Sequence, residues 1–333
     1  MADLQIIFMG AAELSCASLE SLLEAPGFRL LAVVTQPDRP KGREMKLRAS
    51  PVKELALGRG LPVLQPERAR DPAFLAELSR LAPDLIAVTA FGQLLPQTIL
   101  DLPRYGCLNV HTSLLPKYRG AAPIQRAILN GEAQTGVTIM KMDAGLDTGP
   151  ILAQEAAPIG PEDDSQTLHD RLGVMGARLL AQTIRQYVAG SITPIPQPGT
   201  GSSCAPKLKK QDGRIPWTEP APAVWNRVRA LIPWPGAFTF LPSQPQPLLL
   251  KVWRAEIVDA SGAPGQILQA DKTGLVIACG RQALRLLSVQ REGGRRMSGQ
   301  EFLSGHPLQP GQTIGVTSPH STFNTSGSPP CPA

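Results

Sequence analysis

Residues Gly106-Cys-Leu-Asn-Val-His111 form a short apolar run that predicts a buried β-strand. Side chains alternate between the two faces of a strand, so Asn109 and His111 share one face and the apolar residues beside them share the other. Pro116 and the Arg119-Gly120 pair then interrupt the strand and force a loop. Ligands of open parallel sheets bind beside loops at the carboxyl ends of strands, which makes Asn109 and His111 candidate functional residues.

Apolar runs alternate with helical patterns over residues 1–189. The predicted strands span residues 4–9, 28–35, 84–90 and 106–111, and the predicted helices span residues 12–25, 51–59 and 71–81. This alternation is typical of a doubly wound α/β fold, in which helices cover both faces of a mostly parallel sheet. A long helix over residues 165–188, with Ser165 as its N-cap, is expected to close this domain.

The composition changes after this helix. Residues 190–206 are rich in proline, glycine and serine, which favours an extended linker. Short strands follow at residues 248–258, 265–269, 275–278 and 283–289, and this pattern indicates a small β-barrel. We therefore expect a catalytic domain over residues 1–189, a linker over 190–206, a barrel over 207–316 and a disordered tail over 317–333.

The length of 333 residues suits two domains, and 42% of the residues are hydrophobic. No apolar run approaches the roughly 18 residues of a membrane span, and no basic leader precedes the first strand, so we expect a cytoplasmic protein that is not bound to membranes. The five cysteines are widely spaced, without a Cys-x-x-Cys pair or nearby histidines. We expect no metal site.

The net charge of +6 is unevenly distributed. Residues 1–203 contain 19 basic and 20 acidic side chains, whereas residues 204–333 contain 14 and 7. A basic C-terminal part indicates either a polyanionic partner such as a nucleic acid or a basic surface that is merely solvated.

A second polar cluster, Asp143-Ala-Gly-Leu-Asp147-Thr-Gly149, follows an apolar strand predicted over residues 136–142. Its glycines permit tight turns that can hold a carboxylate in a fixed place. The alternative is a hairpin loop in which aspartate only caps turns.

Asn109, His111 and Asp147 together supply an amide donor, a group that titrates near neutral pH and a carboxylate. This set suits acyl transfer to an amine, in which an oxyanion must be stabilised while protons move. Ser113 lies nearby, but the Gly-x-Ser-x-Gly sequence of a nucleophilic serine is absent, which disfavours a hydrolase triad.

The sequence Asn109-Val-His-Thr-Ser-Leu-Leu-Pro116, the following Arg119-Gly-Ala-Ala-Pro-Ile124 and the loop over residues 143–149 together resemble the folate-dependent formyltransferases. The resemblance implies that Asn109, His111 and Asp147 are the catalytic residues. It also implies 10-formyltetrahydrofolate as the formyl donor and no metal. The residues implied to bind the folate are Ser113, Leu114, Leu115, Pro116, Phe91 and Gly92.

A basic stretch follows the second predicted strand. Between Arg39 and Lys53 there are six basic residues and one acidic residue. Such a loop is either mobile and solvated or an arm that contacts phosphates. It is similar to the basic loop of family members that act on tRNA, which implies initiator methionyl-tRNA as the acceptor, contacted at its acceptor stem. The residues implied to bind tRNA are Arg39, Lys41, Arg43, Lys46, Arg48, Lys207, Lys209 and Lys210.

The same resemblance implies a transferase that formylates the α-amine of methionyl-tRNA for translation initiation, with an oligonucleotide-binding-like barrel as its second domain. We expect a monomer. The alternatives are a formyltransferase for a small amine, a formyl-folate hydrolase, or an RNA-binding protein with an inactive transferase domain. The basic loop disfavours a small acceptor, and the intact catalytic residues disfavour an inactive domain. Relatives usually carry Thr-Pro where this chain has Ala11-Ala12, so any hydrogen bond from that threonine is missing.

Overall fold

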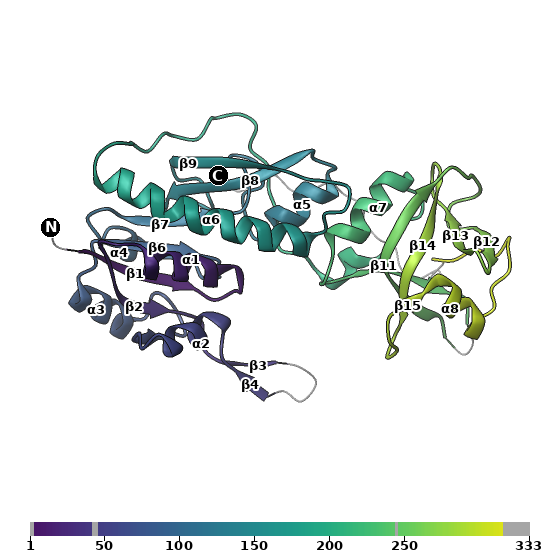
Figure 1. The fold of residues 1–333 in the computed structure, drawn as a ribbon, viewed down its shortest axis with the longest axis horizontal. Helices are drawn as coiled ribbons and strands as arrows, with labels where there is room; N and C mark the ends of the chain where they lie inside the picture. The colour runs from purple at the N-terminus through teal and green to yellow at the C-terminus, as the bar shows by residue number, and fades with distance from the viewer. Residues whose placement is uncertain (1–2, 42–45, 244–245, 316–333) are drawn as a thin grey trace.

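The computed structural model describes residues 3–41, 46–243 and 246–315, and a seven-stranded sheet forms its N-terminal half (Figure 1). The strands, in spatial order, are β5 (Val63–Leu64), β2 (Phe28–Val34), β1 (Leu4–Gly10), β6 (Leu85–Thr89), β7 (Cys107–His111), β8 (Gln134–Lys141) and β9 (Ile151–Pro158). The first five are parallel, whereas β8 is antiparallel to both β7 and β9. The predicted mostly parallel sheet is confirmed.

Helices cover the two faces of this sheet unequally. One face packs against α1 (Leu14–Glu24), α2 (Pro51–Gly58), α5 (Pro123–Leu129) and α6 (Ser165–Val188), and the other against α3 (Pro72–Leu81) and α4 (Gln97–Leu100). Leu108 and Val110 of β7 belong to the first core, whereas Cys107 belongs to the second. The second core takes in no described residue of β8 or β9. Asn109 and His111 share the face of Cys107, so they lie where helical cover ends.

Helix α6 has the predicted bounds but a different N-cap. Asp164, not Ser165, caps it: the Asp164 carboxylate accepts from the backbone N–H groups of Gln166 (2.8 Å) and Thr167 (2.9 Å). The Thr167 hydroxyl in turn accepts from the backbone N–H of Asp164 at 3.0 Å, which completes a capping box. The Ser165 hydroxyl donates instead to the carbonyl of Ile232 in the C-terminal half. The sequence prediction of Ser165 as the cap was wrong because two adjacent residues could both serve.

Replacing Asp164 with alanine is expected to lower the free energy of unfolding by about 1 kcal/mol, since two N–H groups of the first turn lose their acceptor. Urea denaturation with an unchanged m-value measures this loss. Asp170→Ala is the matched control, because Asp170 is an exposed residue of the same helix that caps nothing. An equal loss in both variants would contradict the capping role.

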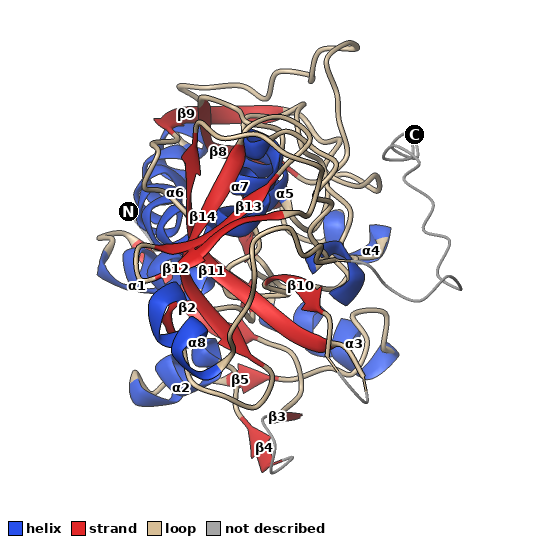
Figure 2. Ribbon diagram, turned by 90° about the vertical axis from the view of Figure 1, so that its right-hand side faces the viewer, coloured by secondary structure: helices blue, strands red, loops and turns tan. Residues whose placement is uncertain are grey.

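A six-stranded antiparallel sheet forms the C-terminal half (Figure 2). Its strands are β10 (Ala237–Leu241), β11 (Leu248–Val258), β12 (Ile267–Asp271), β13 (Gly274–Ala278), β14 (Ala283–Arg291) and β15 (Met297–Ser298), and its helices are α7 (Ala221–Ala230) and α8 (Gly299–Gly305). Residues 312–315 join the two edges of the sheet: Ile314 N–H donates to the carbonyl of Gly265 beside β12, and Gly315 N–H donates to that of Phe240 in β10, both at 2.8 Å. The sheet therefore closes on itself.

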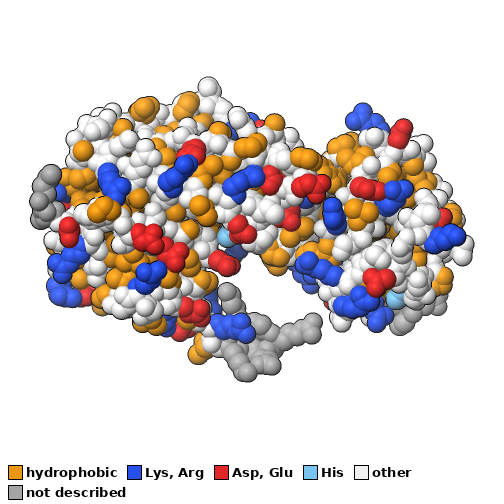
Figure 3. All heavy atoms as spheres, in the orientation of Figure 1, with side chains coloured by type: hydrophobic (Ala, Val, Ile, Leu, Met, Phe, Trp, Pro, Cys, Tyr) orange, Lys and Arg blue, Asp and Glu red, His pale blue; other side chains and the backbone are white. Residues whose placement is uncertain are grey.

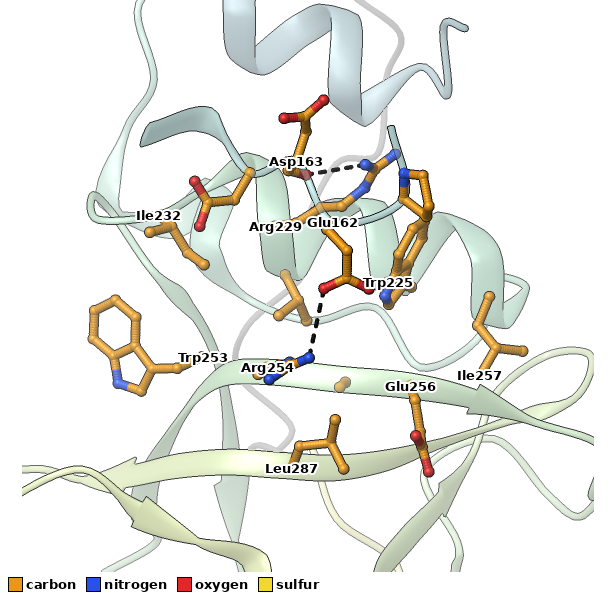
Figure 4. A pocket seen from close by; sticks show the side chains of 14 residues that line it. Glu162, Asp163, Trp225, Arg229, Ile232, Trp253, Arg254, Glu256, Ile257 and Leu287 are labelled. Carbon is orange, nitrogen blue, oxygen red and sulfur yellow. Dashed lines mark hydrogen bonds and ion pairs between the residues drawn. The ribbon is translucent and has the colours of Figure 1, made fainter. Parts of the chain in front are cut away.

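The two halves are held together at the loop that precedes α6. The Arg229 guanidinium of α7 donates to the carbonyls of Gly160 (2.8 Å) and Asp163 (3.0 Å), and burial lowers its pKa. Arg254 of β11 lies 3.5 Å from Glu162. Glu162, Asp163, Arg229 and Arg254 line a cavity of about 470 Å³ between the halves, across which Glu162 and Arg254 are paired (Figure 4). The expected domain bounds stay predictions, and residues 317–333 lie outside the described residues.

None of the helices described here is long and apolar enough to cross a bilayer.

Candidate active site

His111 is the last residue of β7, and oxygen atoms face both of its ring nitrogens. Its side chain is only 6% exposed. Nε2 donates to the carbonyl oxygen of Tyr118 at 2.9 Å, and Nδ1 lies 3.6 Å from Oδ2 of Asp147. Oxygen atoms on both sides therefore fix the orientation of the His111 ring.

Asp147 reaches His111 from the loop between β8 and β9. Its Oδ2 accepts from the backbone N–H of Gly120 at 2.8 Å, and its backbone is left-handed with a φ of 54°. This conformation is uncommon for a residue with a side chain. Asp143 of the same loop has a different role, since it accepts from Gly145 N–H (3.1 Å) and Thr148 Oγ1 (2.7 Å). The hairpin interpretation therefore fits Asp143, while Asp147 points out of the turn toward His111.

Asn109 lies two residues before His111 on the same face of β7. Its side chain is half-buried, and its amide makes no hydrogen bond to any residue in the described part of the chain. A partly desolvated amide without a protein partner can donate to a ligand oxygen.

The loop after β7 is fixed by hydrogen bonds within itself and to β8 and β9. Ser113 and Leu115 are buried, and the Ser113 hydroxyl donates to the carbonyl of Lys117 at 2.7 Å. Leu115 donates its N–H to Thr138 Oγ1 of β8 (3.1 Å), and its carbonyl accepts from Gln154 of β9 (2.9 Å). The structure leaves Leu114 and Pro116 as the half-buried residues of this predicted folate loop.

Of the two predicted folate contacts after β6, Phe91 is buried and Gly92 is exposed. The Phe91 ring is 2% exposed and belongs to the core under α3 and α4, and its carbonyl accepts from Gln36 Nε2 at 2.9 Å. Gly92 is exposed, with a φ of 80°. A ligand at this point would therefore meet the Gly92 backbone rather than the Phe91 ring.

Residues 190–206, which the sequence predicts to be a linker, lie against residues 118–120, whose backbone contacts both His111 and Asp147. Ser203 accepts from the backbone N–H groups of Tyr118 through its hydroxyl (3.0 Å) and of Arg119 through its carbonyl (2.8 Å). Ala205 donates to the carbonyl of Arg119 at 2.6 Å. The sequence predicted no role for these backbone groups, because composition does not reveal contacts between segments about 85 residues apart.

The basic stretch forms a two-stranded hairpin, β3 (Arg39–Lys41) and β4 (Lys46–Arg48), which extends from the edge of the N-terminal half (Figure 1). Arg39 and Arg48 are paired across it and are exposed. Lys53, in contrast, is used internally: it donates to Asp38 at 2.7 Å and lowers the pKa of that carboxyl group. Arg43 and the side chains of Lys41 and Lys46 lie outside the described residues.

Lys207, Lys209 and Lys210 are all exposed at the start of the C-terminal half. A hollow separates the two halves of the molecule, and Lys and Arg side chains lie on both of its sides (Figure 3). Within the described ranges, no group of three or more His, Cys, Asp or Glu side chains could hold a metal ion.

Both halves of this chain match families of known proteins. Residues 5–184 match the family described as formyl transferase, and residues 207–307 match the formyl transferase C-terminal domain. The chain is 48% identical to the methionyl-tRNA formyltransferase of Citrifermentans bemidjiense over 95% of its length and 98% of that relative. It is equally similar to the methionyl-tRNA formyltransferase of Myxococcus xanthus, over 92% of this chain and 96% of that one.

Solved structures share the fold at low sequence identity. The N-formyltransferase of Helicobacter canadensis, in complex with folinic acid and dTDP-3-aminofucose, is 20% identical, with a TM-score of 0.63 over 86% of this chain and 99% of that one. HypX of Aquifex aeolicus, in complex with tetrahydrofolic acid, is 16% identical, with a TM-score of 0.61 over 95% of this chain and 51% of that one.

Proposed function

The chain belongs to the formyl transferase family, and we propose that it transfers the formyl group of 10-formyltetrahydrofolate to the α-amine of initiator methionyl-tRNA. The observation that carries the reaction type is the convergence of Asn109, His111 and Asp147 at the end of β7. The nearly full-length similarity to methionyl-tRNA formyltransferases supports the acceptor.

Each catalytic residue has a distinct role in this proposal. The Asn109 amide and protonated His111 donate to the formyl oxygen as negative charge develops on it. The Asp147 carboxylate, 3.6 Å from Nδ1, orients His111 and favours its charged form. Asp147 can also accept the proton that leaves the attacking amine, directly or through water. A proton then reaches the folate nitrogen as its bond to the formyl carbon breaks and tetrahydrofolate leaves. No covalent intermediate with the protein is required.

The residues around the end of β7 suit a formyl-folate as the formyl donor. The folate supplies the formyl group, and no metal takes part. The unpaired Asn109 amide and the face of β7 left open beyond α3 and α4 offer a place for the formyl end. The exposed Gly92 backbone and the half-buried Leu114 and Pro116 would contact the rest of the molecule.

For the acceptor, we propose that the β3–β4 hairpin contacts the acceptor stem and that Lys207, Lys209 and Lys210 contact the tRNA backbone. Lys207, Lys209, Lys210, Arg39 and Arg48 are exposed, and Lys and Arg side chains lie on both sides of the hollow between the two halves (Figure 3). We further propose that the domains have the predicted bounds and that the protein acts as a cytoplasmic monomer, which sedimentation with and without tRNA can test.

Replacing both Arg39 and Arg48 with alanine is expected to raise KM for tRNA and to make the salt dependence of binding shallower, by about one unit of slope for each phosphate that is no longer neutralised. Turnover at saturating tRNA and KM for the folate should stay close to those of the wild-type protein, because both residues belong to the β3–β4 hairpin and not to β7 or the loop after it. Arg80→Ala is the control, since Arg80 is exposed on α3 and pairs with Glu77. An unchanged salt slope would mean that the hairpin is only solvated.

The proposed function is tested by incubating the protein with 10-formyltetrahydrofolate and charged initiator or elongator methionyl-tRNA. Transfer to the initiator tRNA alone is the expected result. Transfer to a free amino sugar would favour a small-amine formyltransferase, and loss of formyl without an acceptor would favour a formyl-folate hydrolase.

A further inference from the structure

The structure describes residues 195–201 in full, and all of them except Gln197 are exposed. The Gln197 side chain uses every hydrogen-bonding position it has. Nε2 donates to the carbonyls of Asp147 and Gly149, both at 2.8 Å, and Oε1 accepts from Nε (3.1 Å) and Nη2 (2.7 Å) of Arg119. One amide therefore joins three segments that are far apart in the sequence.

These contacts influence both the backbone and the side chain of Asp147. At the backbone, Gln197 fixes the carbonyl of Asp147, whose left-handed conformation must be maintained by its surroundings. At the side chain, the carboxylate accepts from Gly120 N–H, and Gly120 follows the Arg119 that the same glutamine holds. The distance from the carboxylate to His111 thus depends on two backbone segments that Gln197 connects.

Gln197 is not needed to attach this stretch of chain to the N-terminal half. Ile195 exchanges two backbone hydrogen bonds with Ile151, at 2.7 and 2.8 Å. On the other side, Ser203 and Ala205 bind the backbone around Arg119. Because the stretch is anchored on both sides of Gln197, the path of the chain does not depend on the Gln197 amide. Its two Nε2 bonds hold the Asp147 loop, and its Oε1 holds Arg119 beside Gly120.

We propose that Gln197 is a positioning residue that holds Asp147 against His111 in the transfer reaction. The role rests on the proposed function and adds to it a residue outside the three that act on the substrates. A displacement of about 1 Å in a catalytic group can cost about a hundredfold in rate. Loss of Gln197 therefore lowers kcat about 10- to 100-fold, and KM for the folate and for tRNA changes by less than about threefold.

Two variants distinguish the bonds that the Gln197 amide donates from those that it accepts. Gln197→Leu loses all four hydrogen bonds. Gln197→Glu can still accept from Arg119 but cannot donate to the carbonyls of Asp147 and Gly149. If the bonds to the loop matter, both variants lose kcat. The matched controls are Gln182→Leu and Gln182→Glu, which change an exposed glutamine on α6 and keep wild-type kcat.

A double-mutant cycle distinguishes positioning from general destabilisation. In the Asp147→Asn background the carboxylate is already absent, so adding Gln197→Leu should lower kcat by less than about threefold further. A residue that only stabilised the fold would cause the same loss in both backgrounds. Thermal melting of each variant confirms that it is folded under the assay conditions.

The expected pattern is a loss of kcat in both Gln197 variants that nearly vanishes without Asp147. Wild-type kcat in Gln197→Leu or Gln197→Glu, a change in KM alone, or an additive double mutant would overturn the positioning role. A wild-type protein that does not formylate methionyl-tRNA would instead overturn the proposed function. The two failures are therefore distinguishable.

Discussion

Replacing His111 with alanine is expected to lower kcat about 100- to 1000-fold, because the developing oxyanion loses a charged donor. The His111 side chain lies at the end of β7 with both nitrogens directed at oxygen atoms, so alanine removes the donor without moving the strand. Single-turnover formylation of methionyl-tRNA at saturating folate measures the change. Folate binding is expected to survive, since the folate would bind mainly through the neighbouring loops.

His169→Ala is the control for the His111 variant. His169 is a partly exposed residue of α6 that pairs with Asp170, so its loss should leave kcat unchanged. Near-normal turnover in His111→Ala would remove His111 from the mechanism and leave Asn109 as the only polar side chain on that face of β7.

The second large effect is expected from Asp147→Asn, again about 100- to 1000-fold in kcat. Asparagine has the same shape, and its oxygen can still accept from Gly120 N–H, so the loop keeps its anchor. What is lost is the negative charge facing Nδ1 of His111. Steady-state formylation kinetics with both substrates varied separates this loss of kcat from any change in binding.

Asp143→Asn is the matched control within the same loop. Asp143 is exposed and accepts from Gly145 and Thr148, which asparagine can also do. We expect its kcat to stay within about threefold of the wild-type value, as for surface substitutions that preserve local bonds. If both variants lost the same factor, the shape of the loop rather than the charge of Asp147 would control turnover.

The sequence predicted the strand that carries the candidate site and the face on which its polar residues lie. Alternation of side chains along β7 is a local property, and the split of Leu108 and Cys107 between two cores follows from it. The sequence did not reveal that β8 runs antiparallel to β7, because an apolar run looks the same in either direction. It also did not predict strand β10.

Contacts between distant segments account for the rest of what sequence reasoning missed. Gly120 and Tyr118 act through backbone atoms, which no side-chain pattern marks. Gln197 stands alone among prolines and glycines, and only the folded chain brings it to Asp147, 50 residues away in sequence. The charge pattern groups Lys53 with the other basic residues, yet Lys53 belongs to an internal ion pair with Asp38.

Closure of the C-terminal sheet has a consequence for where the chain can be shortened. Residues 312–315 pair with Gly265 and Ile267 at the start of β12, and Gly315 N–H donates to the carbonyl of Phe240 in β10. Without them, backbone groups at the start of β12 and the Phe240 carbonyl of β10 would lose their partners, and unpaired edge groups pair readily with the strands of other molecules. Residues 312–315 therefore protect the folded protein against self-association, and a stop codon placed before residue 312 would favour aggregates even if every catalytic residue were retained.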